Sequence, residues 1–297
     1  MPGSWRVIEQ KPLMRRSILH DQGGFLAGLP PLRDVITRHG IRAKKSLGQN
    51  FLLDLNLTHK IARAGGPLAG QVVMEIGAGP GGLTRALLAE GADHVIAVER
   101  DRRCLAALEE LAIHARGRLT LVAADALTLD EYDLWPRPSQ VVANLPYNIS
   151  TSLLFKWLER LDLFQGLTLM FQKEVAQRII AQPGCKTYGR LSVMVQWLCT
   201  ATTLFDVPPR AFTPAPKVTS TVLFLKPRPM PLAPAEKIKL ETVVAAAFGQ
   251  RRKMLRGSLK QITDRPETLL QAANLDPTLR AEALSVEQFC ALAQALR

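Results

Sequence analysis

The chain has 297 residues, of which 47% are hydrophobic, and a formal net charge of +12. This is enough apolar material for one substantial domain and a smaller second one. Four widely spaced cysteines without a C-x-x-C pair exclude a disulfide framework or a zinc site and fit reduced thiols in the cytoplasm.

No apolar run approaches the roughly 20 residues that span a bilayer. The N-terminus carries charges and lacks the uninterrupted apolar segment of a secretory signal. We therefore expect a cytoplasmic protein with no membrane segment and no metal site.

The positive charge lies in two parts of the chain. Residues 1–49 carry a net charge of +6 and residues 226–265 a net charge of +7, whereas the rest carries −1. A neutral body with two basic ends predicts a polyanionic partner that the ends bind. The alternative is that the basic ends only increase solubility.

The first 30 residues predict a poorly ordered extension, because prolines and glycines interrupt any periodicity. Residues 32–39 predict a short helix. Residues 44–52 combine a basic pair, a polar turn and an apolar anchor, and they precede a predicted helix over 56–64.

The strongest local pattern begins at residue 72. Residues 72–76 predict a buried strand, 77–82 form the glycine-rich turn G-A-G-P-G-G, and 83–89 have helical spacing. This is the first half of a nucleotide-binding βαβ unit. The next strand, 94–98, ends at Glu99, which can accept hydrogen bonds from both hydroxyls of a ribose.

Either NAD or S-adenosylmethionine would use such an acid. The spacing G-x-G-x-G-G departs from the pyrophosphate-binding fingerprint, and Pro80 removes an amide that a phosphate would use. The turn therefore favours S-adenosylmethionine, with a glycine-rich turn that binds no ligand as the alternative.

The alternation of strands and helices continues. Residues 119–123 predict a third strand, tipped by Asp125, which could bind the amino group of the cofactor's adenine. Residues 140–143 and 167–171 predict two more strands, the second followed by a helix over 173–181. The apolar segments 191–198 and 221–225 could complete a mostly parallel, doubly wound α/β sheet.

The fourth strand ends in Asn144-Leu145-Pro146-Tyr147, at the sheet edge where α/β proteins bind ligands. This turn suits methyl transfer to the exocyclic nitrogen of adenine. The Asn144 side chain and the Leu145 main chain offer two carbonyls for the N–H groups, Pro146 holds the backbone, and Tyr147 offers a ring face for stacking. Taken alone, the four residues could also be a polar turn after a core strand.

Beyond residue 226 the chain changes character. A proline-rich stretch predicts a stiff, extended linker, and 236–248, 250–261, 266–273 and 286–296 predict helices. We expect four regions, namely an extension over 1–30, a methyltransferase domain over 31–226, a linker over 227–234 and a helical RNA-binding domain over 235–297. The predicted RNA contacts are Arg42, Lys44, Lys45, Arg251, Arg252, Lys253 and Arg256.

Five motifs occur in an order that resembles the bacterial small-subunit (16S) rRNA adenine N6,N6-dimethyltransferases, over roughly residues 31–297. They are K-S-L-G-Q-N-F-L (45–52), E-I-G-A-G-P-G (75–81), N-L-P-Y-N-I-S (144–150), F-Q-K-E-V-A (171–176) and F-T-P-A-P-K-V (212–218). The resemblance implies a Rossmann-like sheet that uses S-adenosylmethionine, followed by a small all-helical domain.

The resemblance also implies roles for individual residues. Asn50 and Leu52 would close over the cofactor, Gly77 would face its methionine end, Glu99 would hold the ribose and Asp125 the adenine. Asn144 would lie between the cofactor and the target. Phe212 would stack on the target base opposite Tyr147.

The family adds two methyl groups to each of two adjacent adenosines in a hairpin loop near the 3′ end of the small-subunit rRNA, and it acts in late ribosome assembly. The implied partner is therefore the immature small subunit, with the protein a monomer when it is not bound there. Two other functions stay open: a large-subunit adenine dimethyltransferase of the resistance type, and an RNA-binding assembly factor with dispensable catalysis.

Overall fold

The computed structural model describes residues 6–8 and 28–296, without the side chains of 6–8 and of Lys45. Contacts between Cα atoms divide the chain into two compact units. The first comprises the chain up to Lys173 together with Leu204–Leu225. The second comprises Glu174–Thr203 and the chain from Lys226 onward.

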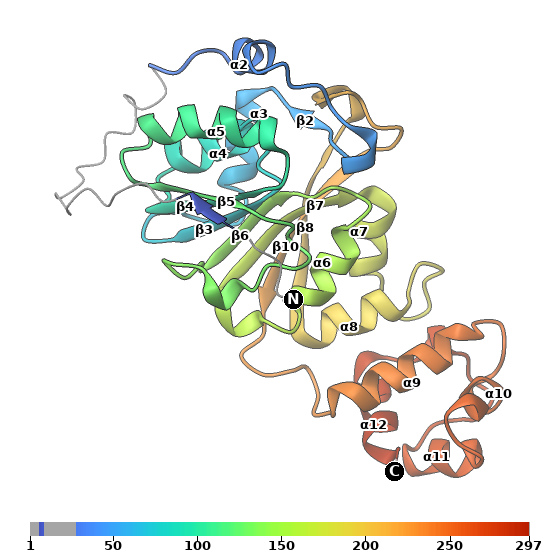
Figure 1. Cartoon of the computed structure of the whole chain (residues 1–297). Coiled ribbons are helices and arrows are strands. Elements are labelled where there is room, and N and C mark those ends of the chain that lie inside the picture. Colours follow the sequence, from blue (N-terminus) through green and yellow to red (C-terminus); the bar gives the residue numbers. More distant parts are fainter. Residues whose placement is uncertain (1–5, 9–27, 297) are drawn as a thin grey trace. The chain divides into compact units, whose positions relative to one another are not determined.

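An eight-stranded sheet with the order β1-β5-β4-β3-β6-β7-β10-β8 forms the framework of the fold (Figure 1). The five central strands run parallel: β5 (Leu119–Ala123), β4 (His94–Glu99), β3 (Val72–Ile76), β6 (Gln140–Asn144) and β7 (Gly166–Gln172). β10 (Ser220–Pro227) runs antiparallel to β7 and is followed at the edge by β8 (Cys199–Val207). The predicted doubly wound α/β sheet is confirmed.

The strand order reverses at β3, which has β4 on one side and β6 on the other. The helices that connect the strands are α4 (Gly82–Ala89), α5 (Arg102–His114) and α6 (Ser150–Trp157). Figure 1 shows α4 and α5 on one side of the sheet and α6 on the other. Such a reversal opens a crevice at the carboxyl ends of the strands, where α/β proteins bind ligands.

Glycine allows the first strand–helix turn to pack closely. Gly77, Gly79 and Gly81 have φ values of +71°, +57° and +90°, which side-chain-bearing residues rarely adopt. At Gly82, a Cβ atom would lie 2.7 Å from the main-chain oxygen of Leu52. The turn can therefore support a neighbouring chain segment directly on its backbone.

That neighbouring segment precedes β3. It contains α2 (Leu32–Arg38), the short strand β2 (Phe51–Leu52) and α3 (Leu55–Ala62), which Asp54 caps through hydrogen bonds to two amides. β2 pairs antiparallel with β9 (Phe212–Thr213). Two motifs that are 160 residues apart in the chain are thus held together by a small second sheet.

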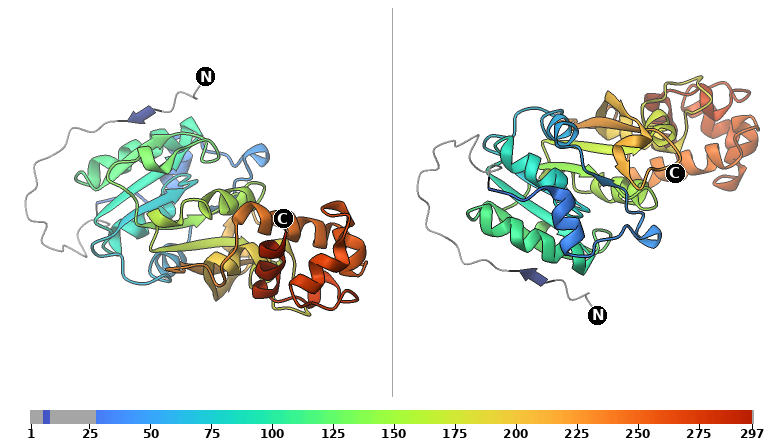
Figure 2. Two further views of the ribbon diagram at one scale, coloured as in Figure 1. Left: turned by 90° about the horizontal axis from the view of Figure 1, so that it is seen from below. Right: turned by 90° about the horizontal axis from the view of Figure 1, so that it is seen from above.

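The second unit is mostly helical, and it also contains the first residues of β8. Its elements are α7 (Lys173–Ile180, whose first residue belongs to the first unit), α8 (Arg190–Leu198), α9 (Lys237–Gly249), α10 (Leu255–Ser258), α11 (Pro266–Ala272) and α12 (Val286–Ala295). Both views in Figure 2 show the helices from α9 onward gathered in one bundle. Tyr188, Phe248 and Phe289 form an aromatic cluster with centroid distances of 5.9 and 5.5 Å, which gives this unit its own core.

The proline-rich stretch is anchored to this unit by hydrogen bonds. The amide of Leu232 donates to the main-chain oxygen of Trp197, and the indole N–H of Trp197 donates to the oxygen of Ala233. Gln294 on α12 donates to the oxygen of Pro234. The domain boundaries at 226 and 235 stay a prediction. The proline-rich stretch itself is hydrogen-bonded to α8 and α12.

Most predicted elements form within two residues of their expected bounds, but two predictions were wrong. Residues 191–198 form helix α8, not a strand. Six of its nine residues are buried, and a helix that is buried on several faces shows no 3.6-residue periodicity in its sequence. The adjacent strand β8, rich in threonine, was not predicted.

The second wrong prediction is the continuous helix over 250–261. α9 ends at Gly249, residues 250–254 form a turn, and only 255–261 are helical, as α10 and a 3-10 turn. The amide of Leu255 donates to the oxygen of Leu279 at 2.7 Å. A contact from a distant loop therefore fixes where this helix begins.

For residues 1–30, Arg6–Ile8 form strand β1, which pairs antiparallel with β5. Residues 1–5 and 9–27 lie outside the described residues, so the prediction of a poorly ordered extension falls mostly there. Among the residues that are described, no helix is long and apolar enough to cross a membrane.

A buried carboxyl group links β3 to α4. Glu75 is 2% exposed and accepts a hydrogen bond of 2.5 Å from the hydroxyl of Thr84. Burial raises the pKa of Glu75 to about 8; the Thr84 hydrogen bond opposes this rise, and the nearby Glu99 carboxyl adds to it. Glu75 is therefore mostly protonated at neutral pH.

We expect Glu75→Gln to stabilise the protein increasingly as the pH rises. The unfolded chain ionises near pH 4.5 and the folded chain near pH 8, so the wild type loses stability across this window and the glutamine variant does not. The difference in free energy of unfolding should reach about 3 kcal/mol at pH 7. Urea unfolding at pH 4, 5.5, 7 and 8 measures it, with Glu109→Gln on an exposed face of α5 as the matched control. A constant difference at all four pH values would contradict the raised pKa.

Candidate functional site

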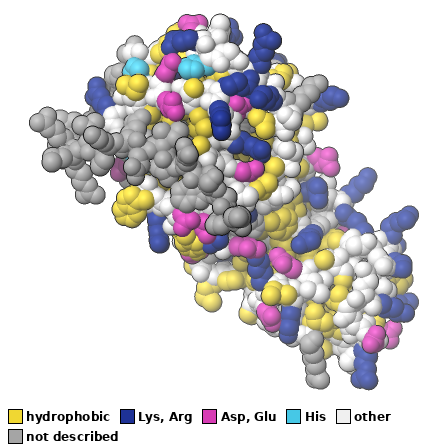
Figure 3. Space-filling model, viewed as in Figure 1, with side chains coloured by type: hydrophobic (Ala, Val, Ile, Leu, Met, Phe, Trp, Pro, Cys, Tyr) yellow, Lys and Arg dark blue, Asp and Glu magenta, His cyan; other side chains and the backbone are white. Residues whose placement is uncertain are grey.

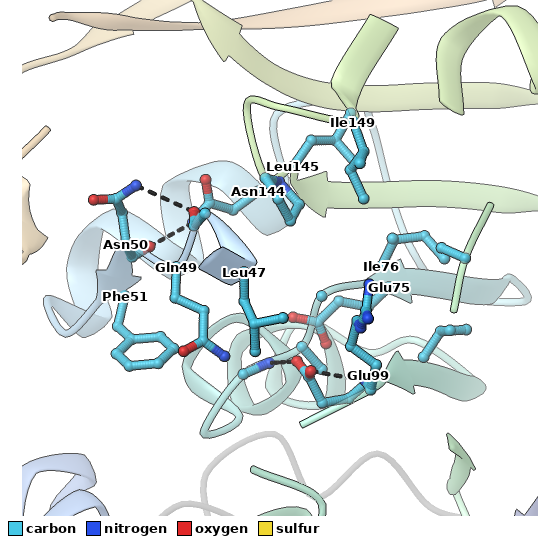
Figure 4. A pocket seen from close by; sticks show the side chains of 18 of the residues that line it. Leu47, Gln49, Asn50, Phe51, Glu75, Ile76, Glu99, Asn144, Leu145 and Ile149 are labelled. Atoms are coloured by element: carbon cyan, nitrogen blue, oxygen red, sulfur yellow. Dashed lines mark hydrogen bonds between the residues drawn. The ribbon is translucent and has the colours of Figure 1, made fainter. Parts of the chain in front are cut away.

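A pocket opens at the carboxyl edge of the sheet. Figure 4 shows side chains that reach it from several elements, with Glu99 from β4, Asn144 from β6 and Asn50 from the loop before β2. Nine of the ten residues predicted for the cofactor and the target base line it: Asn50, Leu52, Gly77, Glu99, Asp125, Asn144, Leu145, Pro146 and Tyr147.

Glu99 lies buried at the tip of β4 with both carboxylate oxygens bound to backbone amides. One oxygen accepts from Gly79 and the other from Arg100 and Asp101, each at 2.8 Å. Burial raises the pKa of Glu99, and these three backbone hydrogen bonds oppose the rise. The carboxyl group is thus held rigidly against the glycine turn, at one wall of the pocket.

Asp125 lies just after β5 and is partly exposed. It forms an ion pair of 2.9 Å with Arg100, and it accepts a hydrogen bond of 3.0 Å from the amide of Leu127. The predicted adenine-binding acid therefore already has two partners, and its contact with a ligand would share or displace Arg100.

The loop over residues 44–50 is fastened across the pocket at two points. Gln49 donates a hydrogen bond of 3.1 Å to Asp101, at the start of α5. Asp101 also binds the guanidinium of Arg103, which lowers the pKa of Asp101 to about 2, so its carboxylate stays charged at neutral pH. A Cβ atom at Gly48 would lie 2.7 Å from the side-chain oxygen of Asn148, so the loop also packs tightly on the turn after β6.

The second attachment of the loop orients Asn144. The side-chain nitrogen of Asn144 donates a hydrogen bond of 3.1 Å to the main-chain oxygen of Asn50. This contact fixes which end of the amide is oxygen, and no hydrogen bond to that oxygen is found among the described residues. Asn144 therefore presents an acceptor to the pocket, as methyl transfer to an amine requires.

The turn after Asn144 is also well held. Leu145 is buried, and the phenol of Tyr147 shares a hydrogen bond of 2.6 Å with the hydroxyl of Ser220. Burial raises the pKa of Tyr147. The ring is half-buried and lines the pocket, so one part of it stays available to a ligand.

Phe212 is not brought together with Tyr147. It is 4% exposed and belongs to the hydrophobic core cluster, and it does not line the pocket. Phe212 is paired with Leu52 in the small β2–β9 sheet, and both belong to the same core cluster. In this structure the Phe212 side chain lies in the core cluster, apart from the pocket that Tyr147 lines, and its stacking role stays a prediction.

The predicted RNA contacts of the first unit lie just before the loop, at Arg42, and at its start, at Lys44 and Lys45. Arg42 and Lys44 are exposed, and the side chain of Lys45 lies outside the described residues. The main-chain oxygen of Arg42 accepts a hydrogen bond from Arg103, which fixes the backbone here. Figure 3 shows Lys and Arg side chains gathered over this region and over α9–α12 on the face drawn.

In the second unit, the predicted basic residues differ from one another. Arg252, Lys253 and Arg256 are exposed, in the turn before α10 and on α10 itself. Arg251 instead forms an ion pair of 3.0 Å with Glu282 and contacts the main-chain oxygen of Cys185. Arg251 is thus engaged within its own unit, whereas the other three are open to a polyanion.

The sequence analysis missed two residues that line the pocket, Gln49 and Glu75, and one that supports a lining residue, Ser220. Gln49 and Glu75 belong to recognised motifs but were given no role, and Ser220 was not considered. Each of the three forms a hydrogen bond with a residue on another element. Gln49 bonds to Asp101, Glu75 to Thr84 and Ser220 to Tyr147. Spacing along the chain therefore carries no signal for these contacts. Within the described part of the chain, no group of three or more His, Cys, Asp and Glu side chains could hold a metal ion.

Comparisons with known proteins show which family the chain belongs to. A family model described as ribosomal RNA adenine dimethylase matches residues 40–297. The ribosomal RNA small subunit methyltransferase A of Rhodospirillum rubrum is 60% identical over 269 residues, which cover 91% of this chain and 93% of the relative. The enzyme of the same name from Mesorhizobium japonicum is 58% identical over 274 residues, which cover 89% of this chain and 97% of the relative.

Two solved structures share the fold at moderate identity. A dimethyladenosine transferase from Plasmodium falciparum has a TM-score of 0.68 and 25% identity, over 82% of this chain and 95% of that one. The 23S rRNA methyltransferase ErmE has a TM-score of 0.61 and 29% identity, over 83% of this chain and 99% of that one. With the family model spanning most of the sequence and close relatives covering nearly all of their own length, the chain belongs to the ribosomal RNA adenine dimethylase family.

Proposed function

We propose that the protein dimethylates N6 of two adjacent adenosines in a hairpin loop near the 3′ end of small-subunit rRNA, with S-adenosylmethionine as methyl donor. The observation that carries the proposal is the orientation of Asn144, whose nitrogen is bound by Asn50 so that its oxygen is left for the target amine. The relatives that are 56–60% identical over about nine-tenths of the chain are named as small-subunit enzymes, which supports the choice of substrate.

The pocket residues fit S-adenosylmethionine. An added Cβ atom would be strained at Gly77, Gly79 and Gly81 and would clash at Gly82, so these glycines form a close backbone cradle. Glu99 offers a buried carboxyl group at the tip of β4. When bound, the cofactor supplies an electrophilic methyl group. We assign Glu99 to the ribose, Asp125 to the adenine of the cofactor, and Gly77, Asn50 and Leu52 to the walls around it.

The chain's own groups would act by positioning and by electrostatics. The Asn144 oxygen and the Leu145 carbonyl accept from the two N–H groups of the adenine amine, which favours a tetrahedral nitrogen whose lone pair can attack. Tyr147 stacks on a base that has been turned out of its helix. The amine becomes strongly acidic once methylated and loses its proton to water, so a dedicated general base is unnecessary.

The two alternatives are weaker for different reasons. The large-subunit function would match ErmE, which is 29% identical, whereas the small-subunit relatives reach 60%. An assembly factor with dispensable catalysis would not need an oriented Asn144. The proposal includes a role in small-subunit assembly, with the protein a monomer off the ribosome. Methyl transfer into undermethylated small subunits, with the modified nucleotides mapped, separates the three functions.

We expect Asn144→Ala to lower the single-turnover rate of methyl transfer by roughly 10²- to 10³-fold, because one preorganised acceptor is removed. Calorimetry should show a much smaller change in the affinity for S-adenosylmethionine. Asn56→Ala, which removes an exposed amide on α3 outside the pocket, is the matched control. A rate loss below threefold in Asn144→Ala would remove Asn144 from the mechanism.

Glu99→Ala should weaken S-adenosylmethionine binding by roughly 1–3 kcal/mol, because the charge-assisted hydrogen bonds to the ribose no longer form. Removing the carboxylate also frees the amides of the glycine turn, so a melting curve must first show that the variant is folded. Titration with NAD should give no heat of binding in the wild type. Tight NAD binding would identify the glycine turn as a dehydrogenase site instead.

The exposed basic residues of the second unit generate a salt-dependence prediction. Replacing Arg252, Lys253 and Arg256 with Gln should weaken binding to the small subunit and make the log–log salt slope shallower. The slope should change by roughly 0.7–0.9 for each phosphate that the variant no longer neutralises. Arg251 is excluded because its replacement would break an ion pair within the unit.

Filter binding at several salt concentrations measures this slope. Lys186→Gln, an exposed basic residue of the same unit outside the basic segment, should leave it unchanged. If the triple variant keeps the wild-type slope, the RNA contacts must be sought at Arg42, Lys44 and Lys45.

A further inference from the structure

Ser220 lies at the same edge of the sheet as the proposed catalytic turn, Asn144 to Tyr147, although 73 positions in the chain separate it from Tyr147. β10 runs antiparallel to β7, and Ser220 at its start is paired with Gln172 at the end of β7. β6 runs parallel to β7, with Asn144 paired with Met170. The first residue of β10 therefore meets the residues that follow β6.

The hydroxyl of Ser220 is buried and has a single described side-chain partner, the phenol of Tyr147, at 2.6 Å. The residues that follow on β10 include Val222, Leu223 and Leu225, all fully buried and apolar. A hydroxyl in such surroundings is costly unless it is hydrogen-bonded. The Tyr147 phenol meets this requirement, and in turn the bond restrains the end of the tyrosine ring that is farthest from its backbone.

We propose that Ser220 is a positioning residue for methyl transfer, whose hydroxyl anchors the Tyr147 phenol and so fixes the plane on which the target adenine stacks. The inference rests on the proposed function, because it needs Tyr147 to contact the base. Its consequence is geometric: a ring that is held at both ends keeps the base in register with Asn144, whereas a ring held only at Cβ can tilt.

The bond joins two neutral groups. Burial raises the pKa of Tyr147, so the phenol is protonated at neutral pH and takes no part as a base. The factor by which Ser220→Ala lowers the rate of methyl transfer should then be the same at pH 6.5 and pH 8.5. This constancy separates an anchoring role from one in which Tyr147 exchanges a proton with the substrate.

The adjacent residue provides a matched control. Thr221 is also buried, and its hydroxyl donates a hydrogen bond of 2.6 Å to Asp206, not to the catalytic turn. Successive residues of a strand point to opposite faces of the sheet. Thr221→Val therefore removes a buried hydroxyl next to Ser220 without touching Tyr147.

The experiment measures single-turnover methyl transfer to undermethylated small subunits at saturating S-adenosylmethionine, for the wild type, Ser220→Ala, Tyr147→Phe and the double variant. Each single variant should lower the rate roughly 3- to 10-fold, the effect expected for one neutral hydrogen bond. Because both remove the same bond, the double variant should be no slower than either single one. The affinities for S-adenosylmethionine and for the subunit should stay within twofold of the wild type.

Two further variants guard against a loss of folding. Ser220→Thr keeps a hydroxyl and should recover most of the rate, and Thr221→Val should match the wild type. Melting curves confirm that the compared variants are folded at the assay temperature. Additive rate reductions in the double variant, or a Ser220→Ala rate equal to the wild type, would overturn the inference.

Failure of the proposed function gives a different result. If the wild type transfers no methyl group to small subunits, or if Tyr147→Ala transfers at the full rate, the assignment of the substrate or of the stacking residue is wrong, and the inference fails with it. If the wild type is active and Tyr147→Ala is not, an unchanged Ser220→Ala rejects the anchor alone.

Discussion

Parallel pairing of β3 with both β4 and β6 is the constraint on which the site depends. It places the ends of β4 and β6 on either side of the glycine turn, so that Glu99 and Asn144 face one pocket although 45 residues separate them. The order of strands reverses at this point, and such a reversal leaves a crevice between the connections to the two sides. A change of pairing register by one residue would turn these side chains to other faces of the sheet.

The loop over residues 44–50 then decides what the pocket can do. It is fastened to Asp101 through Gln49 and to Asn144 through the carbonyl of Asn50. The first attachment uses a carboxylate that stays charged because of Arg103, and the second fixes the orientation of an amide. The same loop begins at the exposed Lys44, two residues after the exposed Arg42, so a segment that contacts RNA would be continuous with one that closes the pocket.

Hydrogen bonds between distant parts of the chain recur around the proposed target site. Tyr147 is held by Ser220, and the motif that ends at Val218 is held by the pairing of Phe212 with Leu52. Phe212 is buried in the core cluster and does not line the pocket to which Tyr147 belongs. The hydroxyl that supports the ring is the buried one at Ser220, two residues after the end of that motif.

Sequence patterns predict the sheet and the glycine turn, and nine of the ten residues that they assign to the cofactor or the base line one pocket, while the roles of these residues stay predictions. These features are local: a buried strand, a turn that needs positive φ and an acid at a strand tip each lie within a few consecutive residues. Tertiary structure decided the rest. Helix α8 is buried on several faces and so lacks a readable period, and the turn over 250–254 exists because a distant loop satisfies the first amide of α10.

The burial of Phe212, the engagement of Arg251 by Glu282 and the contact between Ser220 and Tyr147 each depend on a partner 31 to 160 residues away. Periodicity and composition describe a residue together with its neighbours along the chain. They contain no information about which distant side chain will satisfy a buried polar group, and that is what the packed structure supplies.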